Sequence, residues 1–262
     1  MATHYRTQGI VLKKNDRGEA DQLFTIYTKD FGKLEILGKA IRKIKSKLRA
    51  GIDIFYLAEI EFIQGKAQKT LTEAFLIDKF ENIRRSFKKL KIAYKISEVL
   101  DNLVFGQEPD KKIWQLLIGI FQELNNQKFF NPEFRTEGLQ TKNYLLLYHY
   151  FLWHLSSLLG YKLELYHCSL CQKRLTGGTL FFNPKEGGIV CSQCQEPLKS
   201  IKEISPDIVK ILRFLTEKDW LTIKRLKIET SHLESLKIIS HLYYSYILGE
   251  LAPKNILPRR EF

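Results

Sequence analysis

Four cysteines form the most specific chemical pattern in this chain. They are two Cys-x2-Cys pairs separated by 19 residues: Cys168, Cys171, Cys191 and Cys194. Two knuckles of this spacing can bring four thiolates to one Zn2+ in a tetrahedral site. All four ligand positions would then be filled by protein sulfur, so no position remains for a reactive water. The spacing therefore predicts one structural Zn2+ and no catalytic metal.

The residues around the cysteines are typical of a zinc ribbon. Glycine pairs at 177–178 and 187–188 permit tight turns, and a short apolar strand lies between them at 179–182. His167 precedes Cys168 and offers an alternative ligand, although four correctly spaced thiols do not need it. Two disulfides, or four thiols without metal, are the alternatives to a zinc site.

The start of the chain bears on this choice. The residues MATHYRTQ contain no charged stretch followed by an apolar core, so we expect no signal peptide. A reducing, cytoplasmic location follows from that expectation, and there clustered cysteines bind metal more often than they form disulfides.

A second pattern is a run of cations with no acidic residue among them, which we call the basic segment (residues 39–49). Its charged members are Lys39, Arg42, Lys43, Lys45, Lys47 and Arg49. Six positive charges on one loop suit a phosphate backbone, because binding releases condensed counterions. The cations alternate with Ile41, Ile44 and Leu48, so a short basic amphipathic helix at a membrane surface is an alternative. A solvated run of charge is a third interpretation.

Further cations flank this segment in the sequence and extend the predicted DNA-binding track. They are Lys13, Lys14 and Arg17 in the expected first turn, and Arg84, Arg85, Lys88 and Lys89 at the start of the first expected helix. Cations at a helix N-terminus oppose the helix dipole, which suggests that an external anion compensates them.

Composition agrees with an anionic partner. The 262 residues include 42 Lys plus Arg against 29 Asp plus Glu, a net charge of +13. With 44% hydrophobic residues the chain can bury cores, and its length suggests about two domains. The charge favours nucleic acid, an anionic membrane surface or an acidic protein. The uncharged stretch 143–161 is long enough to span a bilayer, but His149 and His154 within it favour a buried core helix.

The elements that must position these residues fall into two halves. Residues 1–80 contain five short apolar runs separated by turn-prone residues such as 15–18, 30–32 and 64–66, and polar and apolar residues alternate over 57–62. Five strands in this length predict a small antiparallel barrel of the oligonucleotide-binding (OB) type rather than a seven-stranded sandwich.

Residues 81–262 have mainly helical periodicity, so the predicted fold class is α+β: an OB-fold barrel domain followed by a helical domain. Expected helices cover 86–105, a segment capped by Asp110, 143–161, 206–217 and 230–248. The cysteine-containing stretch 166–197 is predicted as a zinc ribbon inserted among them.

Motifs for common catalytic chemistry are absent from the sequence. There is no G-x-x-x-x-G-K-[ST], G-x-S-x-G or H-E-x-x-H, and neither knuckle has the zinc deaminase pattern. The acidic residues of the first half are dispersed, whereas a metal-dependent nuclease needs gathered carboxylates. We therefore expect a protein that is not an enzyme.

The chain resembles the RecO family of bacterial DNA repair and recombination mediators over nearly its whole length. The shared residues are an opening strand ending in GIVL, then GEADQLFTIYTKDFGK, KSKLRAG, LAEIEF, LLGYKLELYHCSLC and GGIVCSQC. The family often has Pro at the position of Leu163, and some members lack the cysteines. Because some family members lack the cysteines, the resemblance favours a stabilising zinc over a reactive one.

The resemblance implies a role in the RecF-type recombination pathway. Such proteins bind single- and double-stranded DNA and anneal complementary strands. With RecR they help the RecA recombinase displace single-strand-binding protein, and they contact the acidic C-terminal tail of that protein. RecF is a further implied partner, and a cytoplasmic, nucleoid-associated location is implied. The alternative function is a zinc-stabilised adaptor that binds acidic protein tails without DNA activity of its own.

Overall fold

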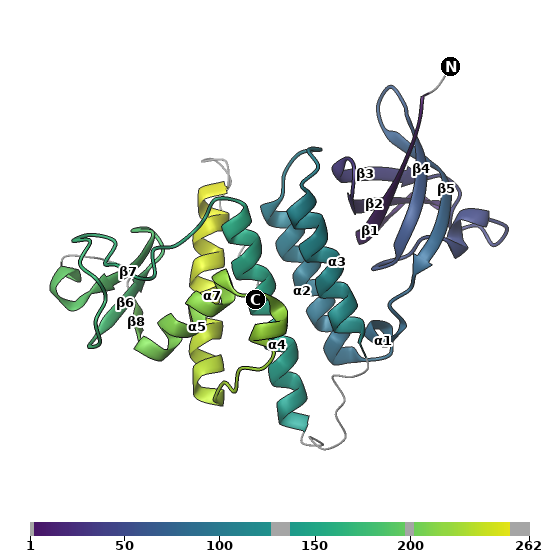
Figure 1. Cartoon of the computed structure of the whole chain (residues 1–262). Coiled ribbons are helices and arrows are strands. Elements are labelled where there is room, and N and C mark those ends of the chain that lie inside the picture. Colours follow the sequence, from purple (N-terminus) through teal and green to yellow (C-terminus); the bar gives the residue numbers. More distant parts are fainter. Residues whose placement is uncertain (1–2, 127–136, 197–201, 252–262) are drawn as a thin grey trace. The chain divides into compact units, whose positions relative to one another are not determined.

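The computed structural model describes residues 3–126, 137–196 and 202–251. The chain divides into two compact units, Met1–Asn131 and Pro132–Phe262 (Figure 1).

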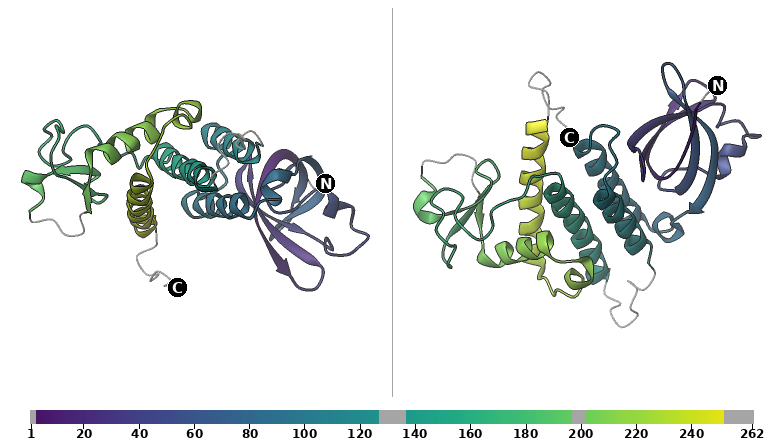
Figure 2. Two further views of the ribbon diagram at one scale, coloured as in Figure 1. Left: turned by 90° about the horizontal axis from the view of Figure 1, so that it is seen from below. Right: turned by 45° about the horizontal axis from the view of Figure 1, so that its top comes forward.

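The first unit begins with a closed five-stranded barrel. Its strands are β1 (His4–Arg17), β2 (Asp21–Thr28), β3 (Gly32–Gly38), β4 (Leu57–Gln64) and β5 (Lys69–Asp78). Their order is β1-β2-β3-β5-β4, and β1 also pairs with β4, which closes the barrel. Only the contact of β3 with β5 is parallel. Both views in Figure 2 show the strands wrapping around one another, and the predicted OB-like barrel is confirmed.

The barrel interior is apolar because every strand presents alternate residues to it. The core cluster contains Val11, Phe24, Ile26, Leu34, Ile36, Ile41, Ile52, Ala58, Ile60, Phe62 and Leu71. The expected turn at residues 15–18 is wrong in detail, because β1 and β2 pair as far as Arg17 and Asp21. A hydrogen bond of 2.8 Å from Gln22 to Asp16 supports this extension of the hairpin.

Three α-helices follow the barrel in the described part of the first unit: α1 (Glu81–Arg84), α2 (Phe87–Leu103) and α3 (Lys111–Asn125). Asp110 caps α3 as predicted, and Ser86, which was expected inside the helix, caps α2. Each side-chain oxygen accepts a hydrogen bond from a backbone N–H of the first turn. The ring of Phe121 on α3 packs 5.8 Å from Phe55 and 5.5 Å from Phe80, centroid to centroid.

The predicted boundary between residues 80 and 81 stays a prediction. It follows the last barrel strand, whereas the compact unit continues to Asn131. The aromatic contacts of Phe121 account for this continuation, since they join α3 to the residues that flank the barrel strands.

The second unit contains four helices and a small sheet within its described residues. The helices are α4 (Glu137–Leu158), α5 (Pro206–Glu217), α6 (Trp220–Ile223) and α7 (Thr230–Leu251). The sheet has the order β7-β6-β8, from β6 (Leu180–Asn183), β7 (Gly188–Cys191) and β8 (Lys202–Ile204). The start of α5 at Ser205-Pro206 is as predicted, α7 runs beyond the expected residue 248, and α4 begins earlier and ends earlier than the expected 143–161.

A buried aromatic stack holds α4 against α7. The ring of Trp153 lies 4.4 Å from that of Tyr243, and its indole N–H donates to the Ser240 hydroxyl at 2.9 Å. Such a stack adds about 0.5–1.5 kcal/mol beyond the area it buries. His149 is also buried, so α4 is the core helix that was predicted. Among the described residues, no helix is long and apolar enough to cross a membrane.

A substitution at Gly51 tests how tightly the residues that follow the basic segment pack against the barrel. A Cβ at this position would lie 1.9 Å from the Ala74 carbonyl oxygen of β5. We expect Gly51→Ala to lower the free energy of unfolding by about 1–3 kcal/mol through overpacking. The matched control is Gly119→Ala on an exposed face of α3, where nothing lies within 4 Å of the new Cβ. That change should raise stability by about 0.5–1 kcal/mol, and urea denaturation of both variants measures the difference.

Candidate metal centre and nucleic-acid interface

The structure brings the four predicted cysteines together. The Sγ atoms of Cys168, Cys171, Cys191 and Cys194 all lie within 4.8 Å of one another, and those of Cys171 and Cys191 are 3.9 Å apart. Zn–S bonds of about 2.3 Å at tetrahedral angles place sulfurs about 3.8 Å apart. A disulfide needs about 2.05 Å, and all four thiols are free. The donor set and its spacing therefore fit a four-coordinate metal ion.

The local backbone favours a negative charge at the centre. Burial raises the pKa of the Cys168 thiol, but hydrogen bonds from backbone N–H groups of Cys171, Cys191 and Leu170 outweigh burial and lower that pKa to about 6. Cys194 behaves oppositely: hydrogen bonds with the Cys171 and Cys191 side chains raise its pKa to about 12. Cys168 thus ionises more readily than Cys194, and a bound cation would favour the thiolate form of all four.

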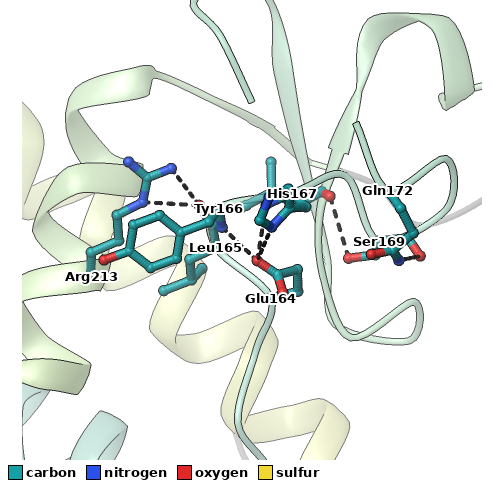
Figure 3. A network of polar contacts seen from close by, with 8 residues as sticks. Glu164, Leu165, Tyr166, His167, Ser169, Gln172 and Arg213 are labelled. Atoms are coloured by element: carbon teal, nitrogen blue, oxygen red, sulfur yellow. Dashed lines mark hydrogen bonds and ion pairs between the residues drawn. The ribbon is translucent and has the colours of Figure 1, made fainter. Parts of the chain in front are cut away.

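A polar network fastens the first knuckle to the helical unit (Figure 3). The Glu164 carboxylate accepts hydrogen bonds from the backbone N–H groups of Tyr166 and His167 at 2.7 and 2.9 Å. Arg213 of α5 donates two hydrogen bonds to the Leu165 carbonyl, at 2.9 and 2.5 Å, and its guanidinium lies 4.2 Å from the Tyr166 ring centroid. These contacts were not predicted from the sequence, because α5 begins far along the chain from the knuckle.

Removing one thiol tests the centre. We expect the purified protein to carry one Zn2+ per chain and Cys191→Ser to lose it, because three thiolates and one hydroxyl hold zinc less well than four thiolates. The matched control Ser192→Ala changes the exposed neighbouring residue and should retain the ion. Elemental analysis measures zinc and thermal unfolding measures stability. Full zinc content in Cys191→Ser would contradict a four-cysteine site.

The basic segment is a loop with fastened ends. At its start, the Ala40 N–H donates to the Asp21 carboxylate at 2.7 Å, and the Ile41 side chain is only 2% exposed. At its end, Leu48 packs against the barrel core. The backbone forms turns followed by a single 3-10 turn, Lys47–Ala50, so the alternative of an amphipathic helix is wrong. The reason is that Ile41 and Leu48 point to the barrel, whereas Ile44 is 93% exposed.

All six predicted cations of the basic segment are exposed. Arg42 forms an ion pair of 3.2 Å with Asp16, and both side chains are largely in solvent, so this pair is weak. None of the other five (Lys39, Lys43, Lys45, Lys47 and Arg49) is paired with a carboxylate of the described residues. The segment therefore presents a concentration of positive charge that the described part of the barrel unit does not neutralise.

The flanking cations differ in exposure and in whether they form ion pairs within the unit. Lys13, Arg17 and Lys88 are exposed. Arg85 is exposed and pairs with Glu81 at 3.1 Å. Lys14 and Arg84 both bind the Asp53 carboxylate, Arg84 at 2.8 Å, and the Arg84 guanidinium lies 4.6 Å from the Tyr56 ring centroid. These last two cations join β1, the chain before β4, and α1.

Lys89 is a correction to the predicted DNA contacts. Its side chain is 1% exposed, and its ammonium donates to the Asn126 carbonyl at 3.3 Å. Burial also lowers the pKa of this ammonium. The helical position puts Lys89 on the face of α2 that packs inward, together with Ile92, Ala93 and Ile96. It cannot reach an external phosphate from there, so it is not a DNA contact.

The pH dependence of stability tests the ion pairs that Asp53 forms with Lys14 and Arg84. Partial burial would raise its pKa, but hydrogen bonds from Lys14 and the Ile54 N–H, with the charges of Lys14 and Arg84, lower that pKa below its usual 3.8. Because folding favours the ionised form, the stabilisation is present above the unfolded pKa and is lost as the pH falls through the folded one. Asp53→Asn should therefore be less stable than wild type at pH 7, and the two should converge below pH 3.8. Urea denaturation across pH measures this, and a gap independent of pH would contradict the ion-pair origin.

A closed five-stranded barrel with an exposed cationic loop, followed by a helical unit with a four-cysteine centre, defines the class of OB-fold proteins with zinc-ribbon-like knuckles. Models of the families described as Recombination protein O N terminal and Recombination protein O C terminal match residues 1–80 and 84–255. The chain therefore belongs to the RecO family of DNA repair and recombination proteins.

Curated relatives agree with this assignment. A DNA repair protein RecO of Dehalococcoides mccartyi is 32% identical over 253 residues, which cover 97% of this chain and 94% of the relative. The proteins of the same name from Roseiflexus and Moorella thermoacetica are 27% and 29% identical, over 96% and 93% of this chain and 83% and 86% of their own lengths. The resemblance expected from the sequence motifs is confirmed.

Proposed function

We propose that this protein binds single-stranded DNA through the basic segment, anneals complementary strands, and acts without catalysis as a recombination mediator of the RecF-type pathway. The observation that carries the proposal is the set of six exposed cations on one anchored loop of an OB-like barrel. Lys13, Arg17, Arg85 and Lys88 supply further exposed charge in the same unit.

The physical basis of annealing is charge neutralisation. Two DNA strands repel each other, and each phosphate that a lysine or arginine neutralises releases a counterion. A loop whose two ends are fastened to the barrel holds its cations together before DNA arrives, so less conformational entropy is lost on binding. No hydrolysis step is needed for this action, which agrees with the absence of nucleotide-binding and hydrolase motifs from the sequence.

The partners of this mediator belong to the same proposal. We infer that it acts with RecR on strands coated by single-strand-binding protein, whose acidic tail it contacts, and that RecA is the recombinase it helps to load, with RecF as a further partner. The four-cysteine centre holds one structural Zn2+ in this proposal, because it fastens two knuckles and leaves no open ligand position.

Salt dependence of binding tests the role of the basic segment. With six phosphate contacts to single-stranded DNA, log K should fall with log salt with a slope of about −4. Replacing Lys43, Lys45 and Lys47 by Ala should reduce the slope by about 2. The control replaces Lys29, Lys66 and Lys79, three exposed lysines of the same unit outside the segment, and thus removes the same net charge.

The same two variants decide between a mediator and an adaptor. In an annealing assay with bare and coated strands, the basic-segment variant should lose activity and the control should keep most of it. An unchanged slope in the basic-segment variant would reject this segment as the DNA contact. Tight binding of an acidic peptide, with negligible DNA affinity of the wild type at physiological salt, would favour the adaptor.

A further inference from the structure

A polar pocket lies at one end of β3, next to the hairpin that joins β4 and β5. It has a volume of about 360 Å3 and belongs entirely to the barrel unit. Its lining residues come from β3, from the β4–β5 hairpin and from the loop between α2 and α3: Lys33, Glu35, Gln64, Ala67, Gln68, Lys69, Gly106 and Gln107. The volume is within the range of small-molecule sites.

The loop between α2 and α3 is held against the barrel, so the pocket walls are preformed. The Lys69 ammonium donates to the Gln107 side-chain carbonyl at 3.0 Å, and the Lys33 ammonium donates to the Asp101 carbonyl at 2.5 Å. Gly32 lies so close to the same loop that a Cβ there would be 2.4 Å from the Glu108 carbonyl oxygen. The three elements that line the pocket are therefore held against one another.

The lining groups suit hydrogen bonding to a polar planar ligand near an anion. Gln64, Gln68 and Gln107 carry amides, which both donate and accept, and Glu35 carries a carboxylate, which accepts. Lys69 is not paired with any carboxylate of the described residues, so its charge is available to an anion. Proteins use amide and carboxylate side chains to form hydrogen bonds with the edges of bases, and lysine commonly binds phosphate.

An exposed aromatic ring lies beside this pocket. Phe105 directly precedes the lining residue Gly106 and is 63% exposed. The ammonium of the lining residue Lys33 lies 5.4 Å from the centroid of the Phe105 ring. A large exposed ring next to amides and a cation is the combination with which single-stranded nucleic acids are bound, because every base has a face that can stack.

We propose that this pocket accepts one unstacked nucleotide of single-stranded DNA, with its base against Phe105 and the amides and its phosphate near Lys69. The inference rests on the proposed DNA-binding function and adds a base contact to it. The pocket is distinct from the basic segment, since none of its lining residues belongs to residues 39–49. One strand would thus be held by its phosphates at the loop and by a base at the pocket.

Binding of two oligonucleotides of equal length tests the proposal: one of thymidylates, the other with abasic sites in place of every base. The ratio of their affinities isolates base contacts from phosphate contacts. Phe105→Ala should lower the affinity for the thymidylate oligonucleotide on the order of tenfold and leave abasic binding unchanged. Lys69→Gln should weaken binding of both and reduce the salt slope by about 0.7.

Two control variants are matched to these changes. Phe87→Ala removes an aromatic side chain that is 81% exposed in the same unit but does not line the pocket. Lys66→Gln removes an exposed cation from the same hairpin that likewise does not line it. We expect the first control to keep the wild-type affinity ratio and the second to keep the wild-type salt slope.

The outcomes separate this inference from the proposed function. If the wild type binds neither oligonucleotide at low salt, the DNA-binding function fails and the pocket proposal fails with it. If the wild type binds but Phe105→Ala keeps the full affinity ratio, only the pocket proposal is overturned. Equal losses in Phe105→Ala and Phe87→Ala would also overturn it, because the effect would not be specific to the pocket.

Discussion

The closure of the barrel by its first strand is the constraint on which the first unit depends. The N-terminal half of β1 pairs with β4 and its C-terminal half with β2, with a register shift between Val11 and Lys13. Gly9 pairs in both directions, and a Cβ there would lie 2.5 Å from the Ile26 side chain. In the barrel order β3 and β4 are separated by β5, so the chain from β3 to β4 must pass β5, and that connection contains the basic segment. The sequence therefore makes this loop cationic, and the closure of the barrel determines where the loop lies.

The positive charge of the chain serves two different purposes in this unit. Lys14 and Arg84 neutralise Asp53, and Lys33 binds the end of α2 through Asp101. These cations connect elements of the unit to one another. The lysines in the middle of the basic segment make no such contact with a described carboxylate and remain accessible. A net charge of +13 thus includes structural cations as well as those available to a polyanion.

The second unit combines a helical part with a small sheet that carries the cysteine knuckles. Its small sheet has only short strands, and its helical part has an aromatic core around Trp153 and Tyr243. The knuckles connect to that helical part through Arg213, which donates two hydrogen bonds to the Leu165 carbonyl. Leu165 lies just before Cys168 in the chain. A metal ion bound by the four thiols would join the two knuckles to each other, which agrees with a stabilising rather than a reactive role.

The sequence by itself determined the barrel strands, the starts of α3 and α5, and the two cysteine knuckles, because periodicity, capping residues and knuckle spacing act over a few neighbouring residues. Only the tertiary structure decided which cations are accessible. Lys88 and Lys89 are adjacent, yet one is in solvent and the other is buried against Asn126, which lies far along the chain. The pocket beside Phe105 likewise needs β3, a hairpin and a loop from three separate places. Burial and pockets depend on contacts between distant residues, and a single sequence does not show which distant residues meet.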